Sequence, residues 1–262
     1  MGKLADFLTA TSEVLRTATG NQKTNIFTSA IIVAAGLSSR MGSEVTKQMM
    51  ELRSIPVVVH TLLTFEKSER INEIIVVAKN DEIPLYDDFA TKYGITKLKK
   101  VVEGGKTRQE SALCGFNATD PKTKFVAIHD AARCLITTEE IEKVLDAAIK
   151  YGAASAATSV FDTVKIVDSK GFISKTEDRN SVKLAQTPQI FSRNLYCAAS
   201  YTARDEGFAA TDDNMLCERI GYRVKLVECS KDNIKITVPE DIAKAERILE
   251  ERDRREILQC SE

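Results

Sequence analysis

The 262-residue chain has no tryptophan, only two histidines, and no apolar run near the roughly 20 residues that a membrane span requires. Its six cysteines are scattered and form no C-x-x-C pair, so the sequence does not indicate a zinc site. Lysine and arginine number 37 against 38 acidic residues, which gives a net charge of −1. No global basic field therefore recruits nucleic acid, and local charges must bind any anionic ligand.

What the chain does contain is typical of a globular protein, with 43% hydrophobic and 29% charged residues. We expect its cysteines to be free thiols in a reducing cytosol, which predicts a cytoplasmic protein. Residues 1–28 lack the long apolar segment of a secretory signal, and we interpret them as an N-terminal extension. Whether this extension is a plain appendage or a docking helix is left open.

Short apolar runs alternate with segments of helical pattern along most of the chain. This alternation predicts an α/β fold, with a mostly parallel sheet that has helices on both faces. The expected strands are Ser29–Ala34, Glu73–Ala78, Lys99–Val102, Phe125–His129, Ala153–Ala157, Arg223–Val227 and Ile234–Val238. The expected helices between them are Val57–Phe65, Ile83–Tyr93, Thr107–Asn117 and one capped by Thr138 that ends at Tyr151, with a closing helix from Pro239.

The alternation stops at Phe161, where two short strand patterns, Phe161–Val167 and Gly171–Lys175, flank a turn. We interpret residues of about 161–185 as an arm that protrudes from the domain. Such an arm is expected to mediate dimerisation or to cover a site.

Three loops directly follow apolar runs, and ligands of parallel sheets bind at the carboxyl ends of strands. The first loop has the small residues Ala34, Ala35 and Gly36 at its start and carries Arg40 and Lys47. Small residues let backbone N–H groups approach phosphates, and the two cations add charge. The pattern is neither G-x-G-x-x-G nor the P-loop, and a plain tight turn would also explain it.

The second loop contains paired glycines that precede a helix start with Arg108 and Ser111. A flat base could lie against Gly105 while Ser111 bonds its edge, although the glycines could simply end a strand. The third loop opens with Asp130, placed to bind Mg²⁺ together with substrate phosphates. His129 beside it is expected to be a packed, hydrogen-bonded residue.

Polar motifs recur on and after the arm, as Asp162–Lys165, Arg179 and Gln186–Gln189. Taken alone they would be solvent-facing residues of an edge hairpin. Further on, Thr211-Asp212-Asp213 could merely cap a helix. Asp232 and Lys235 are less easily explained in this way, because they flank an expected strand near a sheet that already carries a carboxylate at Asp130.

Together these segments resemble the 2-C-methyl-D-erythritol 4-phosphate cytidylyltransferases. The resemblance extends over residues 29–249 and is specific because many motifs recur in order: A-A-G, R-M, K-Q, G-G-x-x-R-x-x-S, H-D-A-A-R, D-T-V-K, Q-T-P-Q, T-D-D and N-I-K-I-T-x-P-E-D. The ribitol 5-phosphate cytidylyltransferases are similar and form the nearest alternative.

The resemblance implies a Rossmann-like nucleotidyltransferase domain over residues 29–249. The run of charged residues after it predicts a charged C-terminal tail at 250–262. It implies transfer of CMP from CTP to 2-C-methyl-D-erythritol 4-phosphate, with release of pyrophosphate and use of Mg²⁺ or another divalent cation. It also implies a homodimer in which each arm completes the partner's site.

Residue roles follow from the same resemblance. Arg40 and Lys47 would be catalytic and bind the triphosphate, and Asp130 and Asp232 would lie at the metal. The acceptor's phosphate would be bound by Lys235 together with Thr163 and Arg179 of the partner's arm. Contacts to CTP would come from Ala34, Ala35, Gly36, Gly105, Arg108, Ser111 and Ala131.

The chain departs from the family pattern at three positions. Ser38 replaces a usual second glycine, Thr46 a usual proline before Lys47, and Cys134 a common proline. None of these changes removes a charged group, so activity is expected, although the loop at Thr46 is expected to be less rigid.

Two other classes of function are weighed. A dinucleotide-dependent oxidoreductase would require G-x-G-x-x-G, which is absent. A non-catalytic nucleotide-binding protein would have no need of the set Arg40, Lys47, Asp130 and Lys235.

Overall fold

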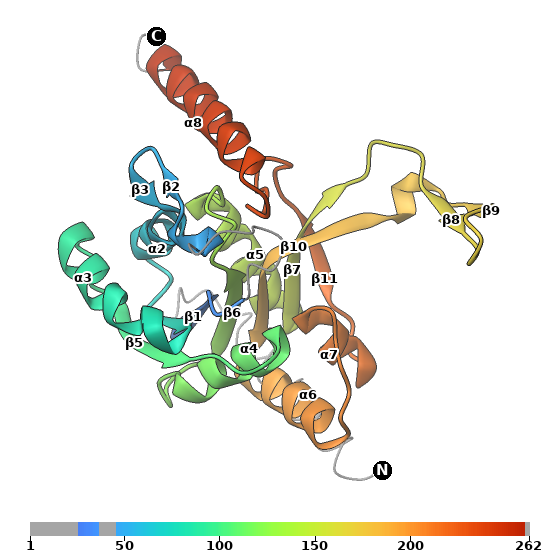
Figure 1. Ribbon diagram of the computed structural model, residues 1–262. Helices are drawn as coiled ribbons and strands as arrows, with labels where there is room; N and C mark the ends of the chain where they lie inside the picture. The colour runs from blue at the N-terminus through green and yellow to red at the C-terminus, as the bar shows by residue number, and fades with distance from the viewer. Residues whose placement is uncertain (1–25, 37–45, 260–262) are drawn as a thin grey trace.

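The computed structural model describes residues 26–36 and 46–259 of the chain. Predictions that fall on Arg40, Ser38 and residues 1–25 therefore lie outside the described residues. A seven-stranded sheet in the order β11-β7-β10-β6-β1-β4-β5 forms the centre (Figure 1). Its strands are β1 Thr28–Val33, β4 Glu73–Ala78, β5 Leu98–Glu103, β6 Phe125–Asp130, β7 Ala153–Ser159, β10 Lys183–Ser192 and β11 Lys225–Glu228.

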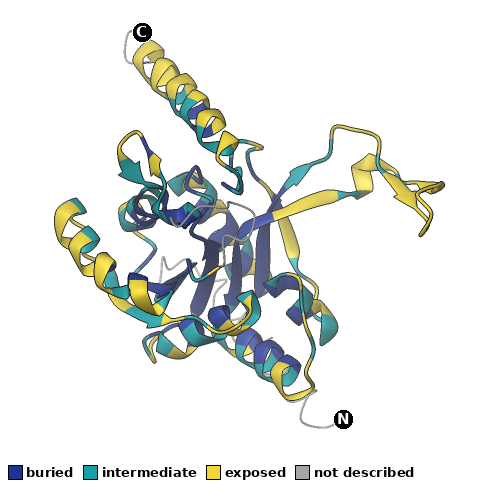
Figure 2. Cartoon of the chain, in the orientation of Figure 1, coloured by how far each residue is buried: buried dark blue, intermediate teal, exposed yellow. Residues whose placement is uncertain are grey.

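Helices pack on both faces of this sheet, and its central strands are buried (Figure 2). The cause is that these strands carry apolar side chains on both sides. On β1, Ala30 and Ile32 belong to the same buried cluster as side chains of α2 Val57–Lys67, α3 Ile83–Tyr93 and α5 Thr138–Tyr151. Ile31, between them, faces the opposite cluster with α4 Arg108–Ala118, α6 Arg193–Asp205 and α7 Asp213–Arg219. The predicted α/β class is confirmed.

Most of the predicted elements are present, with small shifts at their ends. The helix Ile83–Tyr93 is found with the predicted bounds, and Gly94 ends it in the left-handed conformation at φ 66°. The cap of α5 is Thr137 rather than Thr138: its side chain accepts from the Glu140 backbone in a reciprocal capping box.

The expected strand Ile234–Val238 is not a strand. Ile236 is fully buried, but its N–H donates to the carbonyl of Ala132 in the loop after β6, at 2.8 Å, and not to a strand. The closing helix α8 then spans Glu240–Gln259, so the charged run from residue 250 continues a helix through its last described turns. Ala245 and Ile248 are its buried residues, and Figure 1 shows its far end projecting from the body.

Strand β10 is the one element of the sheet that the sequence did not predict. It runs antiparallel between β6 and β7, whereas the other strand pairs described in this sheet are parallel. Pro188 lies within it, where the register against β7 shifts between Ala185 and Gln189. Proline cannot donate to a ladder, so a central strand accommodates it at such an irregularity.

The arm projects from the sheet as predicted (Figure 1). It carries the two-stranded sheet of β8 Lys165–Val167 and β9 Ile173–Thr176. A second small hairpin, β2 Glu51–Leu52 and β3 Ile55–Pro56, turns through Arg53 and Ser54 at positive φ. Among the helices that the structure describes, none combines the length and the apolar character needed to cross a membrane.

Candidate active site

A cavity of about 520 Å³ opens at the carboxyl ends of β1, β4, β5 and β6. This is the edge where ligands of parallel sheets bind. Ten of the predicted site residues line it: Ala34, Ala35, Gly36, Lys47, Gly105, Arg108, Ser111, Asp130, Ala131 and Lys235. The three loops that the sequence singled out therefore contribute to one site in space, together with Lys235.

Positive charge dominates the wall of this cavity. Two acidic residues, Glu103 and Asp130, face five cationic ones, which are Lys47, Lys79, Lys106, Arg108 and Lys235. A concave wall with an excess of one charge concentrates ligands of the opposite charge. The cavity is thus suited to a polyanion such as a nucleoside triphosphate.

The glycines of the cavity wall serve two different purposes. A Cβ on Gly104 would collide with the side chains of Ala35 and Ser111, so this glycine allows the second loop to pack against the first. A Cβ on Gly36 would meet no atom of the described residues within 4 Å. No side chain among those residues packs against Gly36, so its backbone is accessible to a ligand from their side.

Asp130 is the electrostatic centre of the site. Its Oδ1 accepts from Nε of Arg108 at 3.2 Å and its Oδ2 from Nζ of Lys235 at 2.7 Å. Nε of Arg133 lies 3.8 Å from Oδ2. Burial would raise the pKa of Asp130, but the charges of Arg108, Lys235 and Arg133 outweigh it and hold that pKa well below its usual range. Asp130 is therefore ionised whenever the protein is folded near neutral pH.

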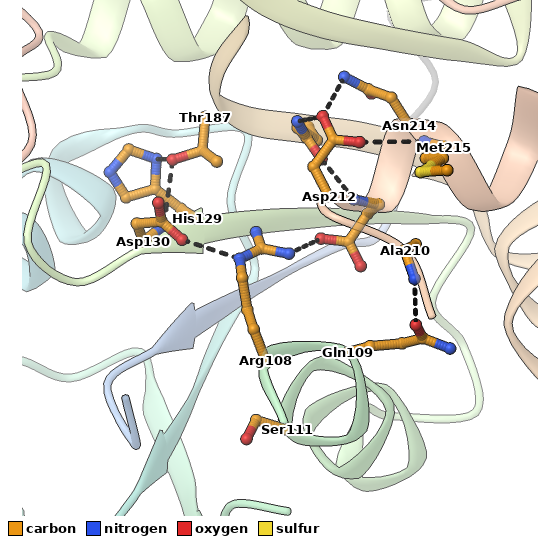
Figure 3. Close-up of polar contacts among 12 residues, drawn as sticks. Arg108, Gln109, Ser111, His129, Asp130, Thr187, Ala210, Asp212, Asn214 and Met215 are labelled. Atoms are coloured by element: carbon orange, nitrogen blue, oxygen red, sulfur yellow. Dashed lines mark hydrogen bonds and ion pairs between the residues drawn. The ribbon is translucent and has the colours of Figure 1, made fainter. Parts of the chain in front are cut away.

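Arg108 is fixed between two carboxylates. Besides Asp130, its Nη1 donates to Oδ2 of Asp213 at 2.6 Å (Figure 3 shows Arg108 reaching Asp130). Asp213 is almost fully buried and also accepts from the hydroxyl of Tyr196 at 3.0 Å. Burial would lower the pKa of Arg108, whereas Asp213 and Asp130 raise it, so the guanidinium stays charged. Two anchors of this kind fix the plane of the guanidinium.

His129 is a structural residue, as expected. Its Nε2 contacts the carbonyl of Arg133 at 3.1 Å, and an acceptor there requires the proton to be on Nε2. Nδ1 then accepts from the hydroxyl of Thr187 at 3.1 Å, and Thr187 in turn accepts from the Asp130 N–H at 3.0 Å (Figure 3). The neutral imidazole of His129 thus links β6 to β10 at the residue next to Asp130.

The buried His129 makes stability depend on pH. Burial lowers the pKa of His129 from 6.5 to about 4. Between these values the unfolded chain binds a proton that the folded one excludes, so stability is lost as pH falls from 6.5 to 4, by on the order of 3 kcal/mol. Urea unfolding at pH 7 and pH 5 should show a smaller loss in a His129→Gln variant than in the wild type. An equal loss in both proteins would contradict the assignment.

Ser111 is buried, and its hydroxyl is already engaged by the second loop. It donates to the carbonyl of Thr107 at 2.8 Å and accepts from the Gly105 N–H at 3.1 Å. Its proton is used within the protein, so what remains for a ligand is an acceptor lone pair.

Other predicted site residues are not in this cavity. Asp232 does not line it, and its N–H donates to Oγ of Ser230 at 3.0 Å. Thr163 and Arg179 are exposed on the arm, and Nη1 of Arg179 donates to the carbonyl of Phe161 at 2.9 Å. Asp130 therefore lines the cavity and Asp232 does not, and their shared role at a metal stays a prediction.

The sequence missed Asp213 and Arg133 as parts of the site. Both belong to motifs that were singled out, T-D-D and H-D-A-A-R, but no role was given to either residue. Lys79 and Lys106 were missed as well and line the cavity from the ends of β4 and β5. Lys79 directly follows an apolar run, and Lys106 directly follows the paired glycines; no other sequence signal points to either residue.

Comparison with known proteins identifies the family. The family model described as 2-C-methyl-D-erythritol 4-phosphate cytidylyltransferase matches residues 28–251. The chain belongs to this family. Proteins with the same description are 41% identical to it in Clostridium botulinum, over 85% of this chain and 97% of that protein, and 42% identical in Caldanaerobacter subterraneus, over 84% and 98%.

Solved structures of cytidylyltransferase family members agree with the fold. The 4-diphosphocytidyl-2C-methyl-D-erythritol synthase of Anaerococcus prevotii has a TM-score of 0.78 and 34% identity, over 86% of this chain and 99% of that one. The cytidylyltransferase of Thermus thermophilus has a TM-score of 0.69 and 28% identity, over 84% and 98%. The resemblance drawn from the motifs is confirmed.

Proposed function

We propose that the protein transfers CMP from CTP to 2-C-methyl-D-erythritol 4-phosphate and releases pyrophosphate. Family membership supports the reaction. The observation in the structure that supports it most is the contact of Asp130 with both Arg108 and Lys235 in one cationic cavity. Arg108, proposed to contact CTP, and Lys235, proposed to bind the acceptor's phosphate, each donate to one oxygen of this carboxylate.

The cytidine end of CTP is assigned to Ala34, Ala35, Gly36, Gly105, Ser111 and Ala131, which line the cavity. No described residue would contact a Cβ at Gly36, and a nucleotide can lie against this backbone. The lone pair left on Ser111 accepts from a donor at the base edge, and the amino group of cytosine is such a donor. Uracil presents a carbonyl at that position, so the arrangement favours CTP over UTP.

The triphosphate is assigned to Lys47 and Arg40, and Arg108 lines the same cavity as Lys47. The acceptor's phosphate oxygen attacks the α-phosphorus, a new P–O bond forms, and the bond from the α-phosphorus to the bridging oxygen breaks as pyrophosphate leaves. Negative charge accumulates on the α-phosphate and the leaving group, where fixed cations stabilise it. A phosphate monoester has its second pKa near 6, so no strong base is required.

A divalent metal fits this cavity only as a partner of the substrate's phosphates. Among the described residues no cluster of three or more metal-binding side chains occurs, and both oxygens of Asp130 already accept from cations. Mg²⁺ commonly binds through one or two carboxylates plus phosphates, and Asp130 is the carboxylate placed to contribute. When bound, the metal would neutralise phosphate charge. Asp232 as a second ligand remains a prediction.

The acceptor's phosphate is assigned to Lys235 and to Thr163 and Arg179 of a second protomer's arm. The arm of this protomer bears large exposed apolar side chains, with Phe161 70% and Phe172 69% exposed. Such surface is costly to leave in water and suits an interface between two copies of the chain. A homodimer with exchanged arms would bring Thr163 and Arg179 of the partner's arm to the cavity.

The described cysteines are all free thiols, as expected for the cytosol.

The reaction is tested by incubating the protein with CTP, Mg²⁺ and 2-C-methyl-D-erythritol 4-phosphate and measuring pyrophosphate and the cytidine diphosphate-linked product together. Equal amounts of both are expected. Pyrophosphate without the linked product would indicate hydrolysis of CTP, and the absence of both would refute the proposed function.

Arg179→Ala is expected to raise the KM for the acceptor by about tenfold or more, because a charged hydrogen bond contributes about 1.5–3 kcal/mol. The KM for CTP should change far less. Lys170→Ala, at the exposed turn of the same arm, is the matched control and should leave both values unchanged. Equal increases of both KM values in Arg179→Ala would argue against an acceptor-binding arm.

A further inference from the structure

Glu82 is a buried carboxylate whose hydrogen bonds go to another part of the chain. It ends the short 3-10 turn Asn80–Glu82 between β4 and α3 and is 6% exposed. Its Oε1 accepts from the hydroxyl of Thr46 at 2.7 Å, and its Oε2 accepts from Nε2 of Gln48 at 3.3 Å. These two donors are the residues on either side of Lys47.

The same turn is also tied to the first strand. Nε2 of Gln48 donates to the carbonyl of Ala34, directly after β1, and Gln48 is 1% exposed. Both partners of Nε2 are acceptors, so the orientation of the amide is determined. The 3-10 turn Lys47–Met49 is therefore attached to the ends of two neighbouring strands, β1 and β4, at the wall of the cavity.

A carboxylate in this position needs an explanation. Burying a polar group is costly unless it is hydrogen-bonded, and an apolar side chain could have filled the space. Both hydrogen bonds of Glu82 fix the backbone that carries Lys47, a residue of the cavity wall. The hydrogen bonds thus offset the cost of burying Glu82 and also fix the position of the backbone from which the side chain of Lys47 extends.

We propose that Glu82 is a positioning residue for Lys47, acting through Thr46 and Gln48. This inference rests on the proposed transfer reaction, in which Lys47 stabilises the transition state. A misplacement of about 1 Å in a catalytic group can lower a rate by 10². Loss of the two hydrogen bonds therefore acts on turnover more than on binding of CTP.

The test compares three variants in the full-length protein. Glu82→Ala removes both hydrogen bonds and should lower kcat by about 10- to 100-fold with less than about a threefold change in the KM for CTP. Glu82→Gln can accept from Gln48 and donate to Thr46, so it should retain kcat within about threefold. Asp81→Ala, at the exposed neighbouring carboxylate, is the matched control and should match the wild type.

A compensating substitution separates positioning from general damage. Thr46 has φ −72° and ψ 147°, which proline also adopts. Thr46→Pro added to Glu82→Ala should therefore restore part of the lost kcat. Hydrogen exchange across residues 46–50 should rise in Glu82→Ala and fall again in the double variant, a readout that is independent of activity.

The outcomes distinguish this inference from the proposed function. An active wild type with unchanged kcat and unchanged exchange in Glu82→Ala would overturn the positioning role. A parallel loss of kcat and CTP binding that Thr46→Pro does not restore would overturn it as well. A wild type that is inactive with CTP but shows increased exchange in Glu82→Ala would refute the transfer reaction and leave the attachment of the turn intact.

Discussion

Lys47→Ala is expected to lower kcat by 10²–10³, the scale for losing one donor to a transition state. Lys47 lies on the cavity wall, on a turn attached to two strand ends, so its ammonium can stabilise charge as it develops on the phosphates. The KM for CTP should rise less than kcat falls, because the interaction is strongest in the transition state. Steady-state kinetics of pyrophosphate release measure both values.

The control for Lys47→Ala is Lys99→Ala. Lys99 is an exposed lysine on β5 whose Nζ donates to the carbonyl of Thr96, three residues before it. It removes the same charge from a site outside the cavity and should leave kcat unchanged. Wild-type turnover in Lys47→Ala would refute its role. A similar loss in both variants would indicate an effect of overall charge.

Asp130→Asn is expected to reduce both stability and turnover. The substitution leaves Lys235 and Arg133 without their shared anion and weakens one of the two anchors of Arg108, because the amide oxygen of asparagine accepts a hydrogen bond without carrying charge. Breaking a buried ion pair from one side costs about 3–5 kcal/mol, and the partial exposure of Lys235 places the expected loss near 3 kcal/mol. Turnover should fall by on the order of 10², because two substrate-binding cations lose their position.

Urea unfolding and kinetics at saturating substrate measure these two effects of Asp130→Asn separately. The matched control is Asp146→Asn, which breaks the exposed pair of Asp146 with Arg70 and should cost less than about 1 kcal/mol. A loss of stability no larger than in the control would show that Asp130 is not the electrostatic centre of the site.

Sequence patterns predicted the elements whose causes are local. The strand Glu73–Ala78 is buried on both faces and is apolar after its first residue, and the helix Ile83–Tyr93 ends at a glycine in the left-handed conformation. Strand β10 escaped prediction because Pro188 argues against a central strand, and only its neighbours β6 and β7 determine its place. The prediction of a strand at Ile234–Val238 was wrong for the opposite reason. The segment has a strand-like pattern, but the N–H of Ile236 donates to a loop carbonyl and not to a strand.

For the site, the sequence predicted which loops meet but not how their side chains are held. Loops at the ends of parallel strands share one edge of the sheet, so the meeting of Gly105, Asp130 and Lys47 follows from topology. The contacts of Arg108 with Asp213 and of Thr46 with Glu82 span 105 and 36 residues of sequence. No local pattern indicates such contacts, which depend on tertiary packing.

The account's central claim is tested most directly by kcat/KM with CTP and Mg²⁺ for two acceptors, 2-C-methyl-D-erythritol 4-phosphate and ribitol 5-phosphate. We predict a preference for the first of about 10²-fold, the scale on which enzymes discriminate between substrates that differ by small groups. Preference for ribitol 5-phosphate would contradict the assigned acceptor and leave the chemistry of transfer intact. Absence of turnover with both acceptors would contradict the proposed reaction itself.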